Sequence, residues 1–266
     1  APEVGFRDTL ADFPRGFSAC VTNPPYLARN VASRKRLAYP ATDYDDVYKM
    51  ALDLCLRHCA HVAAIVPESL IASGLFRTRL VAVVSLDRRM FEDTDHPTCL
   101  ALWHDEPTRR TEVFQARGRI GRLDEIEASV PRAGSTAQLF AFNDPGGVIG
   151  LHAIDNTRTD SIRFCAGREI TAEIKVSSRH LTRIGVPAAR ARQVDDIIAR
   201  ANALLAGYRA DTGDVLLAPF KGLRADGRFR RRLDFATARN LLGCAVAALD
   251  RDGADLHHDL VVSFPQ

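Results

Sequence analysis

Four consecutive residues, Asn23-Pro24-Pro25-Tyr26, have the side chains needed to hold a flat amino group. The Asn23 side-chain carbonyl can accept one hydrogen bond from an amine. A carbonyl within the Pro-Pro step can accept a second, because the two rings fix φ and keep that backbone stiff. The Tyr26 ring can stack on the face of a planar base. Two such acceptors leave the nitrogen lone pair directed away from the ring, so the set suits an amine that attacks an electrophile.

The tetrad also has a plainer interpretation. Asn-Pro and Pro-Pro steps are ordinary turn material, so the alternative is a surface turn that closes a strand. The short apolar run over residues 18–22 predicts a strand that leads into the tetrad under either interpretation.

The elements that must position the tetrad follow it along the chain. Residues 44–56 carry apolar side chains at helical spacing and predict an amphipathic helix. Residues 62–66 predict a buried strand that Pro67 closes. The apolar runs 80–86 and 98–103 predict two more strands. The tetrad is therefore expected beside other strands of an α/β sheet.

The tetrad and these elements resemble, in order, the amino-methyltransferases that use S-adenosylmethionine (SAM), and most closely the DNA adenine-N6 enzymes. The resemblance covers about residues 5–104. The phrases at Asn23–Asn30 and Val66–Ser69 are similar to adenine methyltransferases of type IIS restriction–modification systems. This resemblance implies an α/β class I SAM-methyltransferase (Rossmann-like) core over residues 1–110. It is followed by a mixed α+β region over residues 111–266 that we assign to target recognition and DNA binding.

The resemblance also implies a role for each site residue. Asn23 and the Pro24 carbonyl, within the rigid step that Pro25 completes, would orient N6 of an adenine flipped out of double-stranded DNA. Tyr26 and Phe91 would stack on its two faces, and Asp8 would hydrogen-bond the adenine amino group of SAM. From residue type alone, Asp8 is equally a turn or helix N-cap residue, and Phe91 is a core phenylalanine.

One part of the family pattern is missing. SAM enzymes of this order begin with a strand and a glycine loop, and only seven residues precede Asp8. We therefore expect a core that lacks its first strands and its first cofactor-binding segment. The glycines within residues 142–150 could substitute, but a cofactor loop needs a helix after it and none is predicted there. That segment is interpreted as a hairpin turn.

Overall charge and composition are those of an ordinary protein, and local clusters of basic residues say more about a DNA partner. The net charge is +3, and the hydrophobic fraction of 46% is that of an ordinary globular protein. The chain has no apolar run of membrane-spanning length, so we predict no membrane span. Basic side chains predicted to contact phosphates follow the tetrad and recur in the second region: Arg29, Arg34, Lys35, Arg36, Arg179, Arg230 and Arg231. Their alternative is a solvated surface. A cognate restriction endonuclease is a further possible partner.

Six cysteines are scattered along apolar segments and are interpreted as reduced thiols of a bacterial cytoplasmic protein. Cys55, Cys59 and His61 have metal-ligand types, but no second matching pair is present, so no metal is predicted. Later in the chain, residues 187–206 and 236–249 predict helices, and 162–164 and 174–176 predict strands. Two alternatives remain open: a methyltransferase of RNA bases or protein glutamine, and an inactive DNA-binding or specificity module.

Overall fold

A computed structural model describes residues 7–86, 88–91, 97–116, 118–159, 161–171 and 179–261 of the chain. The chain forms two compact units. The first comprises Ala1–Met90 and Pro97–Asp124, and the second comprises Phe91–His96 and Glu125–Gln266. Along the chain, the last residue of the first unit is Asp124, so the segment 111–124, expected in the second region, belongs to the first unit.

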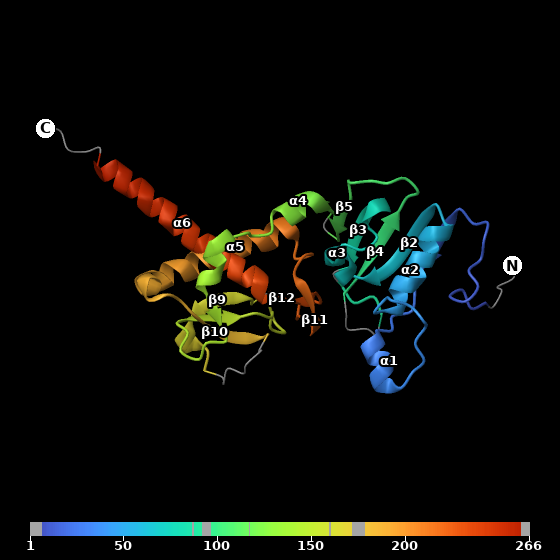
Figure 1. The fold of residues 1–266 in the computed structure, drawn as a ribbon, viewed down its shortest axis with the longest axis horizontal. Helices are drawn as coiled ribbons and strands as arrows, with labels where there is room; N and C mark the ends of the chain where they lie inside the picture. The colour runs from blue at the N-terminus through green and yellow to red at the C-terminus, as the bar shows by residue number, and fades with distance from the viewer. Residues whose placement is uncertain are drawn as a thin grey trace. The chain divides into compact units, whose positions relative to one another are not determined.

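The first unit is built on a six-stranded mixed sheet in the order β1-β2-β4-β3-β5-β6 (Figure 1). The first two strands, β1 (Ala19–Thr22) and β2 (His61–Pro67), are parallel. Next to β2 lies β4 (Thr98–Trp103), which is antiparallel both to β2 and to β3 (Leu80–Leu86). The hairpin of β5 (Glu112–Gln115) and β6 (Gly118–Arg122) completes the sheet, with β5 parallel to β3. Within the described residues β1 pairs with β2 alone, and it is therefore an edge strand.

Helices α1 (Arg29–Lys35), α2 (Val47–His58) and α3 (Ser69–Ser73) and the 3-10 turn η1 (Arg77–Arg79) connect these strands. Helix α2 begins where the Asp46 side chain accepts a hydrogen bond from Tyr48 N, and its buried face includes Leu52 and Cys55. Arg79 closes the other end, because its guanidinium donates to the carbonyls of Leu56, Cys59 and Ala60. Capping at both ends fixes α2 against the sheet.

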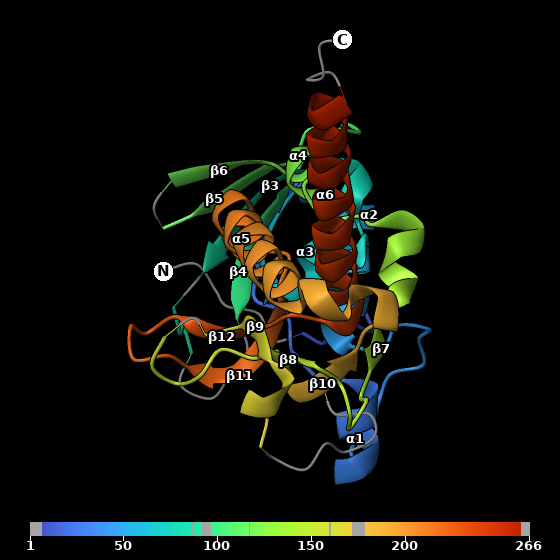
Figure 2. The same cartoon turned by 90° about the vertical axis from the view of Figure 1, so that its left-hand side faces the viewer.

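The second unit holds a four-stranded antiparallel sheet in the order β7-β10-β8-β9. These strands are β7 (Ala141–Phe142), β8 (Ile149–His152), β9 (Arg163–Ala166) and β10 (Leu181–Gly185). Helices α5 (Val194–Thr212) and α6 (Phe235–Val261) pack together beside this sheet (Figure 2). Ile197 and Leu205 from α5, and Leu241 from α6, share one buried core with Leu151 and Phe164 of the strands.

Shorter elements complete the second unit: α4 (Leu123–Ala128) leads into it, and η2 (Gly134–Leu139), η3 (Gly167–Glu169) and η4 (Ala188–Gln193) are 3-10 turns. A hairpin of β11 (Ala218–Leu223) and β12 (Phe229–Arg232) precedes α6. In the described part of the chain, no helix is both long enough and apolar enough to cross a membrane.

The structure confirms the predicted strands around residues 18–22, 62–66, 80–86 and 98–103, and the predicted helices as α2, α5 and α6. The α/β class is confirmed as a mixed sheet with helices; the missing first strands stay a prediction. The strand predicted at 174–176 lies outside the described residues. The turn between β7 and β8 is not a hairpin, because both strands pair with β10 rather than with each other.

Candidate functional site

The tetrad lies at the carboxyl end of β1, where Pro24 and Pro25 stop the strand. Neither proline has an N–H, so the parallel ladder to β2 ends at the pair Thr22–Ala64. Asn23 and Pro25 are exposed, whereas Pro24 is buried. Within the described residues no donor reaches the Pro24 carbonyl oxygen. One of the two acceptors expected for an amine is thus available.

The Tyr26 side chain turns back toward the sheet. Its hydroxyl lies 2.8 Å from the Ile65 carbonyl oxygen of β2 and 2.8 Å from Asn23 Oδ1. The ring packs edge-on against Tyr48, with 6.1 Å between centroids. Burial, together with the nearby Cys99 and Asp46, raises the pKa of Tyr26 to about 12, so the hydroxyl stays a donor. Tyr26 therefore anchors the Asn23 side chain, and its predicted stacking on a base stays a prediction.

The segment that leaves the tetrad is held by the residues before α2. Asp46 Oδ1 accepts from Leu27 N at 3.1 Å as well as from Tyr48 N at 3.4 Å. Backbone bonds flank this contact, from Val47 N to the Leu27 carbonyl and from Arg29 N to the Asp45 carbonyl. Burial raises the pKa of Asp46 above its ordinary value. One carboxylate thus begins the helix and fixes the chain directly after Tyr26.

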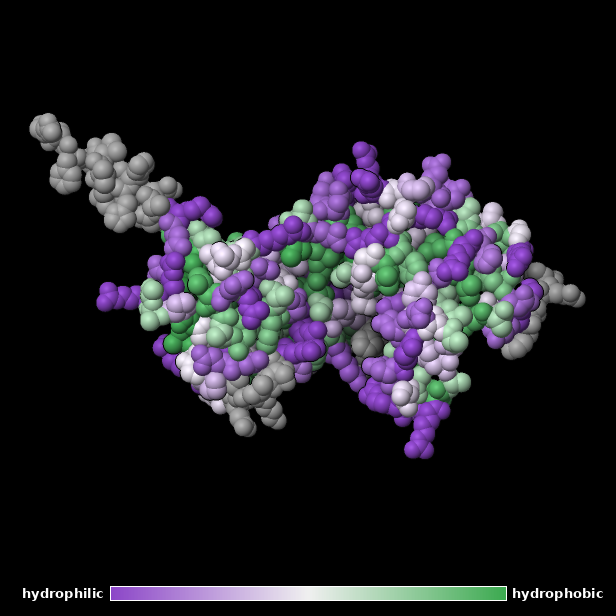
Figure 3. All heavy atoms as spheres, viewed as in Figure 1, coloured by the Kyte–Doolittle hydropathy of each residue, from purple (hydrophilic) through white to green (hydrophobic). Residues whose placement is uncertain are grey.

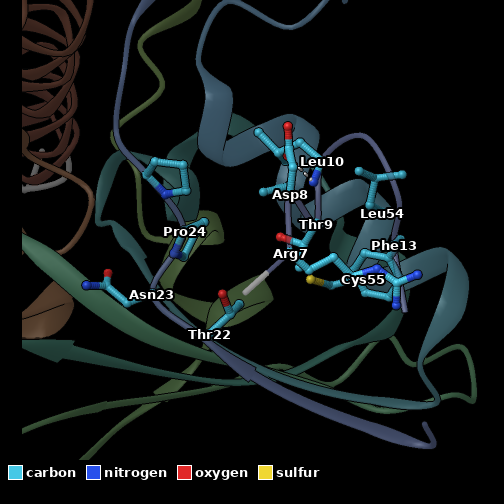
Figure 4. A pocket seen from close by; sticks show the side chains of 12 residues that line it. Arg7, Asp8, Thr9, Leu10, Phe13, Thr22, Asn23, Pro24, Leu54 and Cys55 are labelled. Carbon is cyan, nitrogen blue, oxygen red and sulfur yellow. Dashed lines mark hydrogen bonds between the residues drawn. The ribbon is translucent and has the colours of Figure 1, made fainter. Parts of the chain in front are cut away.

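A cavity of about 320 Å³ joins the tetrad to the segment around Asp8 (Figure 4). Asp8 and Phe13 both line it, and the Asn23 amide points away from them in this view. Thr22, Pro24 and residues of α2 complete the wall. The volume is at the lower end of the range for ligand pockets, about 300–1,000 Å³. The structure thus brings together the two groups of residues predicted for cofactor and substrate.

Asp8 holds a turn through one oxygen of its carboxylate, and its predicted contact with SAM stays a prediction. Oδ1 accepts from Leu10 N at 3.0 Å and from Ala11 N at 3.3 Å, so this oxygen holds a turn. Residues 7 and 8 belong to no strand. Within the described residues Oδ2 has no hydrogen-bond donor, and the carboxylate is exposed at the cavity. The turn interpretation of Asp8 is confirmed, and Oδ2 remains available to a ligand.

Two thiols lie beside the cavity wall. Cys55 lines the cavity, and its sulfur lies 3.6 Å from that of Cys20 on β1. Burial raises the pKa of Cys55 to about 12, which keeps it protonated. Both cysteines are free thiols, and no cluster able to hold a metal is found in the part of the chain that the structure describes. This side of the cavity is therefore largely apolar.

Phe91, the ring expected on the second face of the base, belongs to the second compact unit. Its stacking role stays a prediction.

The basic residues after the tetrad divide into two kinds. Arg29 holds its own loop: its guanidinium donates to the carbonyls of Thr42 and Tyr44 and lies 5.1 Å from the centre of the Tyr39 ring. Arg34, Lys35 and Arg36 are exposed at the end of α1, where hydrophilic side chains gather (Figure 3). These three make no ion pair with a described carboxylate, so they remain candidates for phosphate contact.

The basic residues predicted in the second unit also differ from one another. Arg179 is exposed. Arg230 donates through Nε to the Asp155 carbonyl at 2.6 Å and lies over the Phe220 ring. Arg231 is only 4% exposed, because its strand position faces the interior. A phosphate contact does not fit Arg231, and we leave it out of the proposed interface.

Two acidic residues of the first unit, the half-buried Asp46 and the buried Glu68, were not predicted. Asp46 could have been found, because an aspartate directly before an apolar helical pattern is an N-cap signal. Glu68 is 2% exposed and accepts a hydrogen bond from the Ser85 hydroxyl. No spacing rule pairs residues 68 and 85, because the contact depends on the fold.

Comparison with known proteins gives distant likenesses. No family model and no curated protein matches the chain. Similar solved structures include a type I R-M system, at 20% identity and a TM-score of 0.31, with 43% of this chain and 27% of that one covered. A modification subunit assigned to a type I restriction enzyme from Vibrio vulnificus YJ016 has 18% identity and a TM-score of 0.29, with 43% and 28% covered.

A third structure, assigned as a class I SAM-dependent methyltransferase from Listeria monocytogenes, has 12% identity and a TM-score of 0.30, with 41% of this chain and 39% of that one covered. The chain thus spans less than half the length of each of these proteins. Likenesses of this size carry no argument about activity.

Proposed function

We propose that this chain is the catalytic part of a SAM-dependent methyltransferase that acts on adenine N6 in double-stranded DNA, within a restriction–modification system. The single observation that carries the proposal is the cavity shared by Asp8, Asn23 and Pro24. It combines an exposed carboxylate without a partner on Oδ2 with a backbone carbonyl that no described donor satisfies. These are acceptors for amino groups, and both adenine and SAM carry one.

Asn23 can serve as the second acceptor if its side-chain N–H₂ group, and not Oδ1, faces the Tyr26 hydroxyl. The Tyr26 hydroxyl has one proton, and donating it to the Ile65 carbonyl leaves its oxygen as an acceptor. The Asn23 amide, whose orientation in a structure is an assignment, can then donate its N–H₂ group to that oxygen. Oδ1 in that orientation points away from Tyr26 and can accept from the substrate. Tyr26 thus fixes Asn23 in the orientation that the chemistry requires.

The residues present fit SAM as a cofactor. The Asp8 Oδ2 oxygen suits its adenine amino group, and the cavity wall beside Cys55 is apolar enough for the ring. When bound, SAM supplies the electrophilic methyl group. Asn23 and Pro24 hold the target amine by its two N–H groups and aim its lone pair. The amine would gain the methyl group as the methyl–sulfur bond of SAM breaks, S-adenosylhomocysteine would leave with that electron pair, and one amine proton would pass to solvent.

The chain offers a matched pair of variants to test the cofactor site. Asp8→Asn keeps an oxygen for the Leu10 and Ala11 N–H groups but replaces the free acceptor with a donor. Asp8→Ala removes both functions. We expect calorimetric titration of the full-length protein to show SAM binding at least about 10-fold weaker in Asp8→Asn, equivalent to one lost hydrogen bond of about 1.4 kcal/mol. Unchanged SAM affinity in a folded Asp8→Asn protein would refute this site.

A further inference from the structure

Two cysteines that are far apart in the sequence lie in contact beside the cavity. Cys20 is on β1 and Cys55 is on α2, and their sulfur atoms are 3.6 Å apart. Cys55 lines the cavity (Figure 4). Cys20 is on the same face of β1 as Thr22, which also lines the cavity, because side chains alternate along a strand. Both thiols therefore lie at the cavity wall, and neither has a role in the proposed methyl transfer.

A third thiol lies near the pair. Cys59, at the end of α2, is buried, and burial together with the neighbouring Cys20 raises its pKa. Cysteines that gather in one place are typical metal ligands, but in the described residues no three such side chains are placed to hold a metal ion. The chemistry open to two neighbouring thiols is then oxidation to a disulfide.

A small movement would bring the two sulfur atoms to bonding distance. A disulfide joins sulfurs at about 2 Å, so the atoms of Cys20 and Cys55 would approach each other by about 1.5 Å. Helix α2 is held at both ends by Asp46 and Arg79. Strand β1, by contrast, pairs within the described residues with β2 alone. We therefore expect β1 to move, and the cavity residues that follow Cys20 to move with it.

The two thiols differ in their access to solvent. Cys20 is partly exposed, whereas Cys55 is only 5% exposed. Burial, with Cys20 beside it, raises the pKa of Cys55 to about 12, so this sulfur is protonated near pH 7. An oxidant that arrives from solvent therefore reacts first with Cys20.

We infer that Cys20 and Cys55 form an oxidation site at which hydrogen peroxide closes the cavity. In the first step the O–O bond breaks, one oxygen forms a sulfenic acid on Cys20, and the other leaves as water with the thiol proton. In the second step the Cys55 sulfur attacks the Cys20 sulfur, the S–O bond breaks, and the hydroxide leaves as water with the Cys55 proton. The two thiols lose two electrons, and the peroxide is reduced to two waters. In a reducing compartment the disulfide is transient, as in redox-sensing proteins.

The disulfide would act on the cavity through β1. Drawing Cys20 toward α2 also draws Thr22 and Asn23, which narrows a cavity whose volume of about 320 Å³ is already small for a ligand. The inference rests on the proposed function for SAM as the ligand that is excluded. It goes beyond that function by giving the two thiols reversible control of the site.

The test treats the full-length protein with hydrogen peroxide and then removes the excess. Peptide mapping by mass spectrometry without reduction identifies the linked cysteines, and calorimetric titration measures the affinity for SAM. We expect a peptide that joins Cys20 to Cys55. We also expect SAM binding at least about 10-fold weaker, comparable with the loss of one hydrogen bond. Dithiothreitol should reverse both changes.

Two matched variants separate this pair from general oxidation. Cys20→Ser removes one partner, whereas Cys244→Ser removes a partly exposed thiol of the second unit. Only Cys20→Ser should make the affinity for SAM insensitive to peroxide. If circular dichroism shows that Cys20→Ser is unfolded, Cys20→Ala takes its place, because it adds no polar group.

Three results of the mapping and titration would overturn the inference: no peptide joining Cys20 to Cys55, a link from Cys20 to Cys59 in its place, or equal losses of SAM affinity in the wild type and Cys20→Ser. A cross-linked protein that binds SAM as tightly as the reduced one would overturn it as well.

Hydrogen exchange over residues 19–23 gives a readout that needs no SAM. A cross-link to α2 should slow exchange in this edge strand, because it opposes local opening. If the reduced protein does not bind SAM, the proposed function fails. Slower exchange after oxidation would then still support the oxidation site, and unchanged exchange would refute it.

Discussion

Replacing Tyr26 with phenylalanine isolates the hydroxyl that links the tetrad to the sheet. The change keeps the ring and its packing against Tyr48 but removes the hydrogen bond to the Ile65 carbonyl and the contact with Asn23. A hydrogen bond contributes about 0.5–1.5 kcal/mol net, and an unsatisfied buried acceptor costs about 1–3 kcal/mol. Ile65 is half-buried, so water can reach its carbonyl in part. We therefore expect Tyr26→Phe to lower the free energy of unfolding by about 1–2 kcal/mol.

The single tryptophan makes this measurement specific to the first unit. Trp103 is 3% exposed in β4, which pairs with β2, and its indole N–H donates to the Phe76 carbonyl at 2.9 Å. Urea unfolding followed by Trp103 fluorescence therefore reports the sheet that carries the tetrad.

The same variant should lower the rate of methyl transfer about 10-fold, equivalent to about 1.4 kcal/mol, because Asn23 loses its fixed orientation. Its affinity for DNA should change little, since the ring is kept.

Alkaline pH gives a second readout of the same hydroxyl. The folded-state pKa of Tyr26 is about 12, above the ordinary value of 10.0, so the folded state holds this proton more tightly than the unfolded state. Its contribution to stability is complete below pH 10 and is lost as the pH rises toward about 12. In Tyr26→Phe the free energy of unfolding should fall less steeply over this pH range than in the wild type. A variant as stable as the wild type, with the same alkaline decline and the same rate, would refute the anchoring role of Tyr26.

Substitutions at three further residues test the parts that position the site and the second unit. Asp46→Ala should lower the free energy of unfolding by about 0.5–2 kcal/mol and slow methyl transfer, and urea unfolding and a rate assay would measure the two effects. Asp46→Asn keeps an acceptor for Leu27 N, so both effects should be smaller. Equal effects of the two variants would contradict the role of the Asp46 side chain in holding Leu27 and the start of α2. Arg79→Met should lower the free energy of unfolding, followed by Trp103 fluorescence, by about 3 kcal/mol or more, because the guanidinium donates hydrogen bonds to several backbone carbonyls. A smaller loss would contradict its capping role. Arg209→Met should destabilise the second unit by about 3–5 kcal/mol, because it leaves Asp155 buried without its main partner; an unchanged thermal melt of the helical circular dichroism would contradict this.

The strands and helices around the tetrad could be predicted because their signals are local. Proline rings end β1, apolar periodicity defines α2, and short apolar runs define β2, β3 and β4. The unit boundary could not be predicted in the same way. The predicted boundary after residue 110 would separate β5 from the sheet, yet β5 pairs with β3. That pairing is set by long-range contacts, which local composition does not encode.

The candidate site, too, could be predicted from the sequence only in part. The family resemblance, not residue type, implied that Asp8 and Asn23 serve one site, and both line the same cavity. The return of the Tyr26 hydroxyl to Ile65 could not be predicted, because it depends on how β1 and β2 align. Burial also determines which of the basic residues can contact a phosphate. Arg231 carries the same charge as Arg179, but its position in a paired strand buries it.

The most direct test of the central claim is methyl transfer from isotope-labelled SAM to duplex DNA by the full-length protein, with the modified nucleoside identified by mass spectrometry. We expect N6-methyladenine from the wild type. In Asn23→Ala we expect the rate to fall by at least about 100-fold, equivalent to about 2.7 kcal/mol, with DNA binding largely kept. Methylation of RNA or protein in place of DNA, or an unchanged rate in Asn23→Ala, would refute the proposed function.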